Sequence, residues 1–383
     1  MTTQTKATIE EYFRDLDDPR IDRTKRHKLL DILVIAICAV ICGADNWVDV
    51  AMFGEAKHEW FKTFLELPNG IPSHDTFNRV FNRLDPKQFS RCFTRWINAT
   101  SQLIGGEVIA IDGKVLRRSH DRGIGKGAID MVSAWASANR LVLGQVKVDE
   151  KSNEITAIPE LLRALEIAGC IVTIDAIGCQ TGIAALITGK DANYTFALKE
   201  NQGRLYEDVK LLFDDLEESD YRAYPFDYHK TVDKGHGRIE IRECWTISDA
   251  QILQYLSGYE KWPQLATVCR IRSQRIIGDE HSTEDRYYIA SIQGAEKVLA
   301  SVRSHWGIEN KVHWTLDIAF DEDRCRVRKE HGAENFAILR HLTLNLLKRE
   351  TTSTRSISGK RLLAGWNDEY LTKVLAGLGG SQA

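Results

Sequence analysis

The pattern of hydrophobic and polar positions divides the chain into three parts. Residues 1–100 carry apolar side chains at helical spacing, and from Gly105 short apolar runs alternate with helical segments. From residue 295 onward the helical spacing returns. Apolar runs of four to eight residues bounded by turn residues predict buried strands. We therefore expect an all-α N-terminal domain followed by an α/β domain.

The first hundred residues predict a small bundle of helices. LLDILVIAICAVICGA, from Leu29, is apolar nearly all round and predicts the central helix. ATIEEYFRDL and WVDVAMFGEAKHEWFKTFL predict further helices, and SHDTFNRVFNRL places Phe77, Val80 and Phe81 on one face. Two short helices around a turn could form a helix-turn-helix that enters a DNA groove. Simple packing between the helices is the alternative explanation.

After Gly105 the pattern predicts the order β-β-β-α-β-α-β, typical of a mixed α/β sheet. Residues 205–290 break this order and predict a β-rich insertion, which we expect to be separate from the sheet. The expected domains are residues 1–104, a catalytic domain over 105–350 that contains the insertion, and a C-terminal tail over 351–383 with a short helix.

The helix that begins near residue 295 has an unusual polar stripe. His305, Glu309 and His313 fall on one line at helical spacing, with Trp306 and Asn310 one position over. A core helix would fill such a stripe with aliphatic residues. The stripe therefore predicts the wall of a functional site.

Two acids at strand ends are the expected partners of Glu309. Asp112 ends the apolar run IAID and Asp175 ends TID, and the ends of adjacent strands form the usual ligand crevice of an open α/β sheet. Three converging carboxylates repel one another unless a cation neutralises them. Each aspartate taken alone could equally cap a helix or pair with a lysine.

Composition and net charge exclude some classes of protein. The net charge of −3 over 383 residues excludes a generally basic surface, so any DNA contact must come from local clusters. The longest apolar run, Leu29 to Cys42, is interrupted by Asp31 and is too short to span a bilayer. The eight cysteines are scattered without paired spacing and the sequence shows no signal peptide, so we expect reduced thiols and a cytoplasmic protein. Two basic clusters could contact phosphate or simply be solvated: Arg20, Arg23, Lys25, Arg26, His27 and Lys28, and then Arg324, Arg326, Arg328 and Lys329.

Several motifs in one order carry a resemblance to a known family. They are IAIDGKVLRRS, DEKSNEITAIPELL, TIDAIGCQ, LKENQGRL, HGRIEIR and RSHWGIENKVHWTLDIAFDEDRCRVR. Together they resemble DDE-type insertion-sequence transposases, and among these the H-repeat-associated transposases. The likeness extends into the N-terminal region through DILVIAICAVICGA and GIPSHDTFNRVF.

The resemblance implies a ribonuclease H-like fold in which Asp112, Asp175 and Glu309 hold two Mg²⁺ ions, with Mn²⁺ able to substitute. It implies attack by water, and then by a DNA 3′-hydroxyl, on phosphodiesters at transposon ends. The implied partners are double-stranded DNA and a second copy of the chain bound on DNA, with no membrane. The implied location is the bacterial cytoplasm, on the nucleoid when DNA is bound.

The sequence departs from the family pattern around Glu309. Related transposases place a Tyr, an Arg and a Lys at fixed offsets, where this chain has Val302, His305 and Leu316. Other residues would then contact DNA. Trp306 could stack on an extruded base, or it could be a tryptophan buried in an interface. The candidate DNA contacts are Lys114, Lys199, Asn201, His305, Trp306, Asn310, Lys311, His313 and Arg326. Gln180, at a strand exit, is a weaker candidate.

Two other functions remain open from the residues. His305, Glu309 and His313 could form a zinc site of a hydrolase, although that leaves Asp112 and Asp175 without a role. Alternatively, the chain could be a DNA-binding regulator or an inactive transposase remnant that uses only residues 1–100.

Overall fold

The computed structural model describes residues 11–120, 127–149, 152–235 and 237–377. The helix expected at ATIEEYFRDL lies partly outside the described residues. None of the helices within the described residues is long and apolar enough to cross a membrane.

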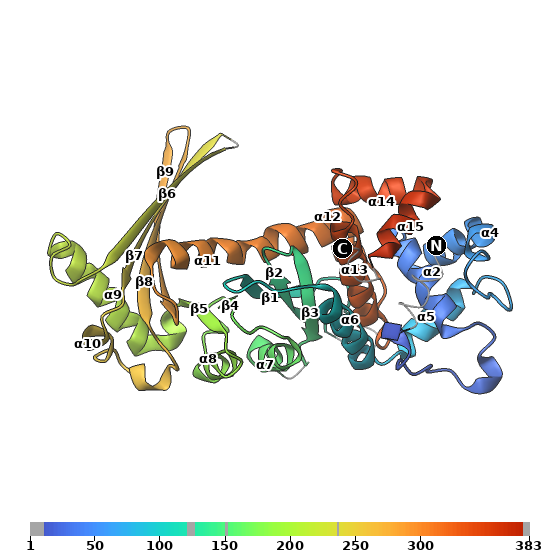
Figure 1. The fold of residues 1–383 in the computed structure, drawn as a ribbon, viewed down its shortest axis with the longest axis horizontal. Helices are drawn as coiled ribbons and strands as arrows, with labels where there is room; N and C mark the ends of the chain where they lie inside the picture. Colours follow the sequence, from blue (N-terminus) through green and yellow to red (C-terminus); the bar gives the residue numbers. More distant parts are fainter. Residues whose placement is uncertain (1–10, 121–126, 150–151, 236, 378–383) are drawn as a thin grey trace.

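Within the described residues, the centre of the molecule is a mixed sheet of nine strands in the order β3-β2-β1-β4-β5-β9-β8-β7-β6 (Figure 1). The strands are β1 (Val108–Leu116), β2 (Ile129–Ala136), β3 (Leu141–Lys147), β4 (Ile171–Ile174), β5 (Asn193–Leu198), β6 (Asp227–Gly235), β7 (Arg238–Ile247), β8 (Thr267–Ile277) and β9 (Glu280–Ala290). The predicted order β-β-β-α-β-α-β up to residue 198 is confirmed.

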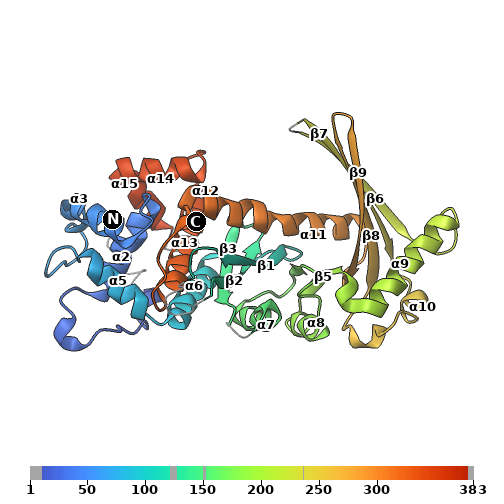
Figure 2. The same ribbon diagram turned by 180° about the vertical axis from the view of Figure 1, so that it is seen from behind.

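The β-rich section continues the sheet, so the expectation of a separate insertion was wrong. Strand β9 pairs antiparallel with β5, from Thr195 opposite Ala290 to Leu198 opposite Tyr287. The edge of β5 would otherwise expose unpaired backbone groups, and β9 covers it. Beyond this junction β6 to β9 extend past the body as a long wing (Figures 1 and 2). The section begins with the helix α9 (Gly203–Glu218), which the apolar pattern did not predict.

Helices cover both faces of the sheet. One face carries α7 (Glu154–Ala164) and α8 (Thr181–Thr188). Helix α11 (Ala295–Ile308) crosses the opposite face and contacts β1, β2 and β4 to β8 (Figure 2). A π-helical turn, η5 (Glu309–His313), joins α11 to α12 (Trp314–Phe320). The long helix with the polar stripe is therefore confirmed, with an irregular turn at its functional part.

At the β3 end, helices from both chain ends form one core (Figure 1). Helix α13 (Gly332–Arg349) is buried from Gly332 to Leu347 apart from Glu334. It is enclosed because N-terminal helices, β3 and C-terminal helices all pack around it. The helices around it are α2 (Leu29–Ile41), α5 (His74–Arg83), α6 (Pro86–Thr100), α14 (Ile357–Trp366) and α15 (Asp368–Ala376). The proposed division at residues 104 and 350 stays a prediction.

The helices expected as a helix-turn-helix are arranged differently from that motif. Residues 62–73 separate α4 (His58–Phe61) from α5, whereas a helix-turn-helix has a turn of about three or four residues. Helix α5 buries Phe77, Val80 and Phe81 against α3 (Trp47–Ala56) and α13. This geometry favours the simple-packing explanation.

Candidate active site

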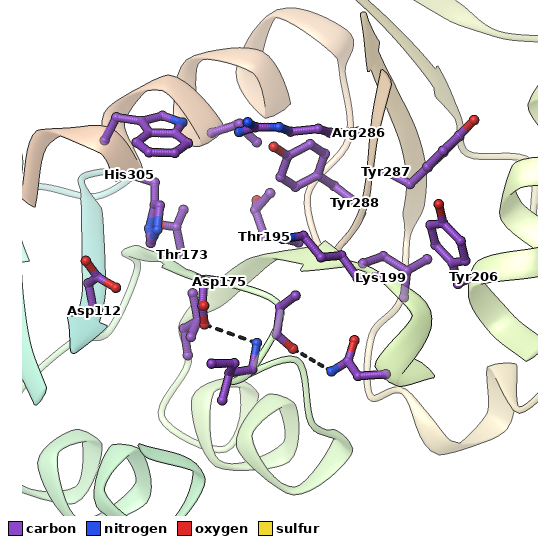
Figure 3. Close-up of a pocket in the computed structure, with 18 of the residues that line it drawn as sticks. Asp112, Thr173, Asp175, Thr195, Lys199, Tyr206, Arg286, Tyr287, Tyr288 and His305 are labelled. Atoms are coloured by element: carbon purple, nitrogen blue, oxygen red, sulfur yellow. Dashed lines mark hydrogen bonds between the residues drawn. The ribbon is translucent and has the colours of Figure 1, made fainter. Parts of the chain in front are cut away.

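Parallel pairing of β1 with β4 brings two of the predicted acids together. Ile111 pairs with Ile174, and Asp112 and Asp175 are the next residues along these two adjacent segments. The two aspartates therefore lie side by side at the same level of the sheet. The side chains face the cavity shown in Figure 3. The apolar runs before them are buried, which fixes the strands and leaves the carboxylates at the edge of the core.

The loop after β4 fixes Asp175. Its Oδ1 accepts the backbone N–H groups of Ile177 (3.1 Å) and Gly178 (3.4 Å). A Cβ at Gly178 would lie 2.2 Å from Cγ2 of Ile174, so the turn needs glycine for this close approach. Asn201 ties the same loop by donating its amide to the carbonyl of Ala176 at 2.6 Å.

Glu309 reaches Asp112 from the π-helical turn. Its Oε2 lies 3.2 Å from Nδ1 of His313, and that nitrogen lies 3.6 Å from Oδ2 of Asp112. Ligand atoms of Asp112, Glu309 and His313 all fall within 4.8 Å of one another, close enough for a single metal ion. π-helical turns inside α-helices occur frequently at functional sites.

Two lysines hold the backbone of this turn. Lys114, two residues after Asp112, donates to the carbonyl of His313 at 3.2 Å. Lys348 on α13 donates to the carbonyl of Lys311 at 2.8 Å, and its ammonium lies 3.9 Å from the centre of the Trp135 ring. Burial lowers the pKa of Lys348 to about 7. The segment that carries Glu309 is thus fixed to β1 and α13.

The electrostatics of the site are those of crowded carboxylates. Burial first, and then the charges of Asp175 and Glu154, raise the pKa of Asp112 to about 7. Burial also lowers the pKa of His305 and of His313. An uncompensated group of acids of this kind attracts a cation.

Glu154 is a fourth acid that sequence reasoning missed. It opens α7, and a Cβ at Gly113 would lie 2.1 Å from its Oε1, so the carboxylate rests on the backbone next to Asp112. Burial, and then the charges of Asp130 and Asp175, raise its pKa to about 7. The one feature of the sequence that could have identified Glu154 was its place in the run KSNEITAIPELL. Its distance along the chain from Asp112 does not indicate that the two residues are close.

Asp112, Asp175 and Glu309, but not Glu154, line a cavity of about 1080 Å³. Of the predicted residues, Asp112, Asp175, Gln180, Lys199, Asn201, His305, Trp306 and Glu309 line it. Strand β9 and α9 add residues that we did not predict, namely Tyr206, Arg286, Tyr287 and Tyr288 (Figure 3). The face of β9 that these residues occupy could not be assigned from the sequence, because it depends on the pairing of β9 with β5.

The remaining predicted DNA contacts lie in different surroundings. Lys114 is bound inside, to Asp317 at 2.5 Å and to Glu322 at 2.9 Å as well as to His313. Asn310 and Lys311 are exposed on the π-helical turn. Arg326 is exposed beyond η6 (Glu322–Arg324) and does not line this cavity. Contact with DNA stays a prediction for all of them.

The zinc trio proposed from the stripe is not assembled among the described residues. His305 lies outside the cluster of Asp112, Glu309 and His313, and its Nδ1 lies 3.2 Å from the hydroxyl of Thr173. His313 stays beside Glu309, with Nδ1 3.2 Å from Oε2 of the glutamate, and the same nitrogen lies 3.6 Å from Oδ2 of Asp112.

Comparison with known families matches nearly the whole chain. Residues 104–346 match the family described as "Transposase DDE domain", and residues 10–97 match "DDE_Tnp_1-associated". A solved piggyBac transposase synaptic complex with hairpin DNA aligns with 99% of this chain and 79% of its own, with a TM-score of 0.40 and 10% identity. That TM-score is too low to establish a shared fold.

Curated relatives cover the chain from end to end. The chain is 39% identical to the "H repeat-associated putative transposase YhhI" of Escherichia coli strain K12, over 97% of this chain and 98% of the relative. It is also 39% identical to the "Putative transposase YncI" of Escherichia coli O157:H7, over 96% and 94%. The chain therefore belongs to the family of transposases with a DDE domain.

Proposed function

We propose that this protein is an insertion-sequence transposase that hydrolyses DNA phosphodiesters and transfers the resulting 3′-hydroxyl ends to new DNA. The observation that carries the proposal is the convergence of Asp112, Asp175 and Glu309 on one cavity from β1, the end of β4 and the π-helical turn. Double-stranded DNA is the proposed partner, bound by two copies of the chain, since two element ends must be joined.

The strand arrangement supports a ribonuclease H-like catalytic core. Strands β1, β2 and β3 are consecutive and antiparallel, and β4 and β5 are added parallel to β1 on its other side. The resemblance noted in the sequence implies this order. It is the arrangement that sets Asp112 beside Asp175.

The donor set fits Mg²⁺ or Mn²⁺. Asp112, Asp175 and Glu309 offer carboxylate oxygens, which hard divalent ions prefer. Burial first, and then the charges of Asp175 and Glu154, raise the pKa of Asp112, and a bound cation would offset both effects. His313 adds a nitrogen that Mn²⁺ tolerates. When bound, such ions would neutralise phosphate charge and promote deprotonation of the attacking water or 3′-hydroxyl.

The chain's own residues would orient the phosphodiester. Lys199 and Arg286 bring positive charge to the cavity wall opposite the acids (Figure 3), where Nε and Nη2 of Arg286 also donate to Glu284 at 2.8 and 2.9 Å. His305 has a lowered pKa, so near neutral pH it acts as a neutral hydrogen-bonding group. These residues replace the Tyr, Arg and Lys offsets that the chain lacks.

Glu154 is proposed to support the metal site through its position beside Asp112. We expect Glu154→Gln to weaken Mn²⁺ binding about 10-fold or more, within the 10–100-fold range typical of outer groups that orient metal ligands. Isothermal titration calorimetry with Mn²⁺ on the DNA-free protein measures this directly. Glu160→Gln is the matched control, because Glu160 is exposed on the same helix. Equal Mn²⁺ affinity of the Glu154 and Glu160 variants would remove Glu154 from the site.

A cleavage assay tests the function itself. A supercoiled plasmid that carries the coding region with its native flanking DNA is incubated with the protein in Mg²⁺, and the ends of released DNA are sequenced. The proposal predicts excision at fixed flanking positions that leaves 3′-hydroxyl ends. Binding of the plasmid without any strand cleavage, in Mg²⁺ or Mn²⁺, would favour a DNA-binding regulator or an inactive remnant.

A further inference from the structure

A second cavity of about 700 Å³ lies between the wing and α11. Strands β7, β8 and β9 form one wall, and α11 with the start of the π-helical turn forms the other. Five arginines line it, and we call the cavity with these residues the arginine groove: Arg238, Arg242, Arg275, Arg286 and Arg303. No motif in the sequence identified this groove, because its two walls are far apart in the chain.

The groove carries excess positive charge. The ion pairs described for its five guanidinium groups involve three carboxylates, those of Asp233, Glu240 and Glu284. Arg275 is exposed and forms no ion pair within the part of the chain that the structure describes. The positive charge is therefore available to an anionic ligand.

The arginine groove is continuous with the catalytic cavity. Arg286, Tyr288 and Trp306 line both cavities. Trp306 is 48% exposed, and the guanidinium of Arg286 lies 5.4 Å from the centre of its ring. A polymer that leaves the catalytic cavity past Trp306 therefore enters the arginine groove.

We propose that the arginine groove binds a single DNA strand where it continues from the phosphodiester held at Asp112 and Asp175. This rests on the proposed function, since it takes DNA as the substrate. Guanidinium groups bind phosphates, and an exposed aromatic ring stacks on any base, which together are the usual means of holding single strands. A cavity of about 700 Å³ is in the size range of small-molecule pockets, about 300–1,000 Å³, so it accommodates a short stretch of one strand.

The test measures the affinity of the full-length protein for a fluorescein-labelled single-stranded oligonucleotide over a range of KCl concentrations, in EDTA. Each lost phosphate contact lowers the slope of log K against log[salt] by about 0.7 for single strands. We expect Arg275→Gln and Arg303→Gln each to reduce the slope by about this amount, and the double variant to bind about 10-fold more weakly at low salt. Arg275→Lys keeps the charge and should keep the slope.

Arg222→Gln is the control, because Arg222 is also exposed but lines neither cavity. Unchanged slopes in the Arg275 and Arg303 variants, or binding of duplex DNA only, would overturn the proposal. The assay needs neither metal nor cleavage, so its outcome is independent of catalysis. If slopes fall as expected but the plasmid is never cut, the proposed function fails and the arginine groove stands.

Discussion

Replacement of Asp112 by asparagine is expected to abolish DNA cleavage, with a loss in rate of about 10³-fold or more, while DNA binding persists. The amide keeps the shape of the side chain but removes the negative charge that a divalent ion needs. Asp175→Asn and Glu309→Gln should have the same effect, since all three line one cavity. Conversion of supercoiled plasmid in Mg²⁺ measures cleavage, and gel retardation measures binding. Near-normal cleavage by any one variant would show that its residue is not a metal ligand.

Loss of cleavage in Asp112→Asn should not reflect unfolding, because this variant is expected to be the more stable protein at pH 8 without metal. The carboxyl has a pKa of about 7 in the folded chain and about 4 when unfolded. The stability that this group contributes is therefore present below about pH 4 and lost as the pH rises through about 7. The shift is worth at most about 4 kcal/mol.

Thermal unfolding in EDTA at pH 5 and pH 8 checks this sign. The midpoint of Asp112→Asn should exceed that of the wild type by more at pH 8 than at pH 5. Asp191→Asn, in an exposed turn after α8, is the control and should change neither value. If Asp112→Asn is less stable than the wild type at pH 8, then attraction of Asp112 to a nearby cation outweighs its repulsion by the other acids.

Lys114→Met is expected to lower the free energy of unfolding by about 3–5 kcal/mol, the usual cost of removing one partner from a buried ion pair. The lysine is bound to Asp317 at 2.5 Å and Glu322 at 2.9 Å, and the side chain of Glu322 is only 2% exposed. Arg340, at 3.7 Å, would be the remaining cation near Glu322. Urea unfolding followed by tryptophan fluorescence measures the change.

The same variant should slow cleavage, because Lys114 also holds the carbonyl of His313 in the turn that carries Glu309. Lys199→Met is the matched control for stability, since Lys199 is exposed. If Lys114→Met unfolds at the wild-type urea concentration and binds DNA more weakly, Lys114 contacts DNA as the sequence suggested, and its internal ion pairs contribute little.

Local sequence pattern was sufficient to predict the strands that lead to Asp112 and Asp175 and that Glu309 lies at the same cavity, while the catalytic role of the three acids stays a prediction. Asp112 and Asp175 each end a short apolar run, and parallel pairing of such runs aligns their ends. Glu309 was recognisable because a polar stripe on a helix beside the sheet is costly unless it serves a site. Each of these signals lies within about ten residues of the residue it identifies.

Features that depend on pairing between distant segments could not be predicted. The junction of β9 with β5 turns an expected insertion into part of the sheet and brings Arg286 and Tyr288 to the cavity. The ion pairs of Lys114 could not be predicted, because its partners Asp317 and Glu322 lie about two hundred residues later. The π-helical turn at Glu309 likewise depends on Lys114 and Lys348, whose contacts no local pattern records.

Anomalous diffraction from crystals soaked in MnCl₂ tests the central claim most directly, because Mn²⁺ takes the oxygen ligands that Mg²⁺ takes. We expect a Mn²⁺ peak bonded to carboxylate oxygens of Asp112 and Asp175, with Glu309 as a further ligand, and its loss in Asp112→Asn. A cavity without Mn²⁺ at saturating concentration, or tightly held zinc on His305, Glu309 and His313 in its place, would contradict a metal-dependent DNA transposase built on these three acids.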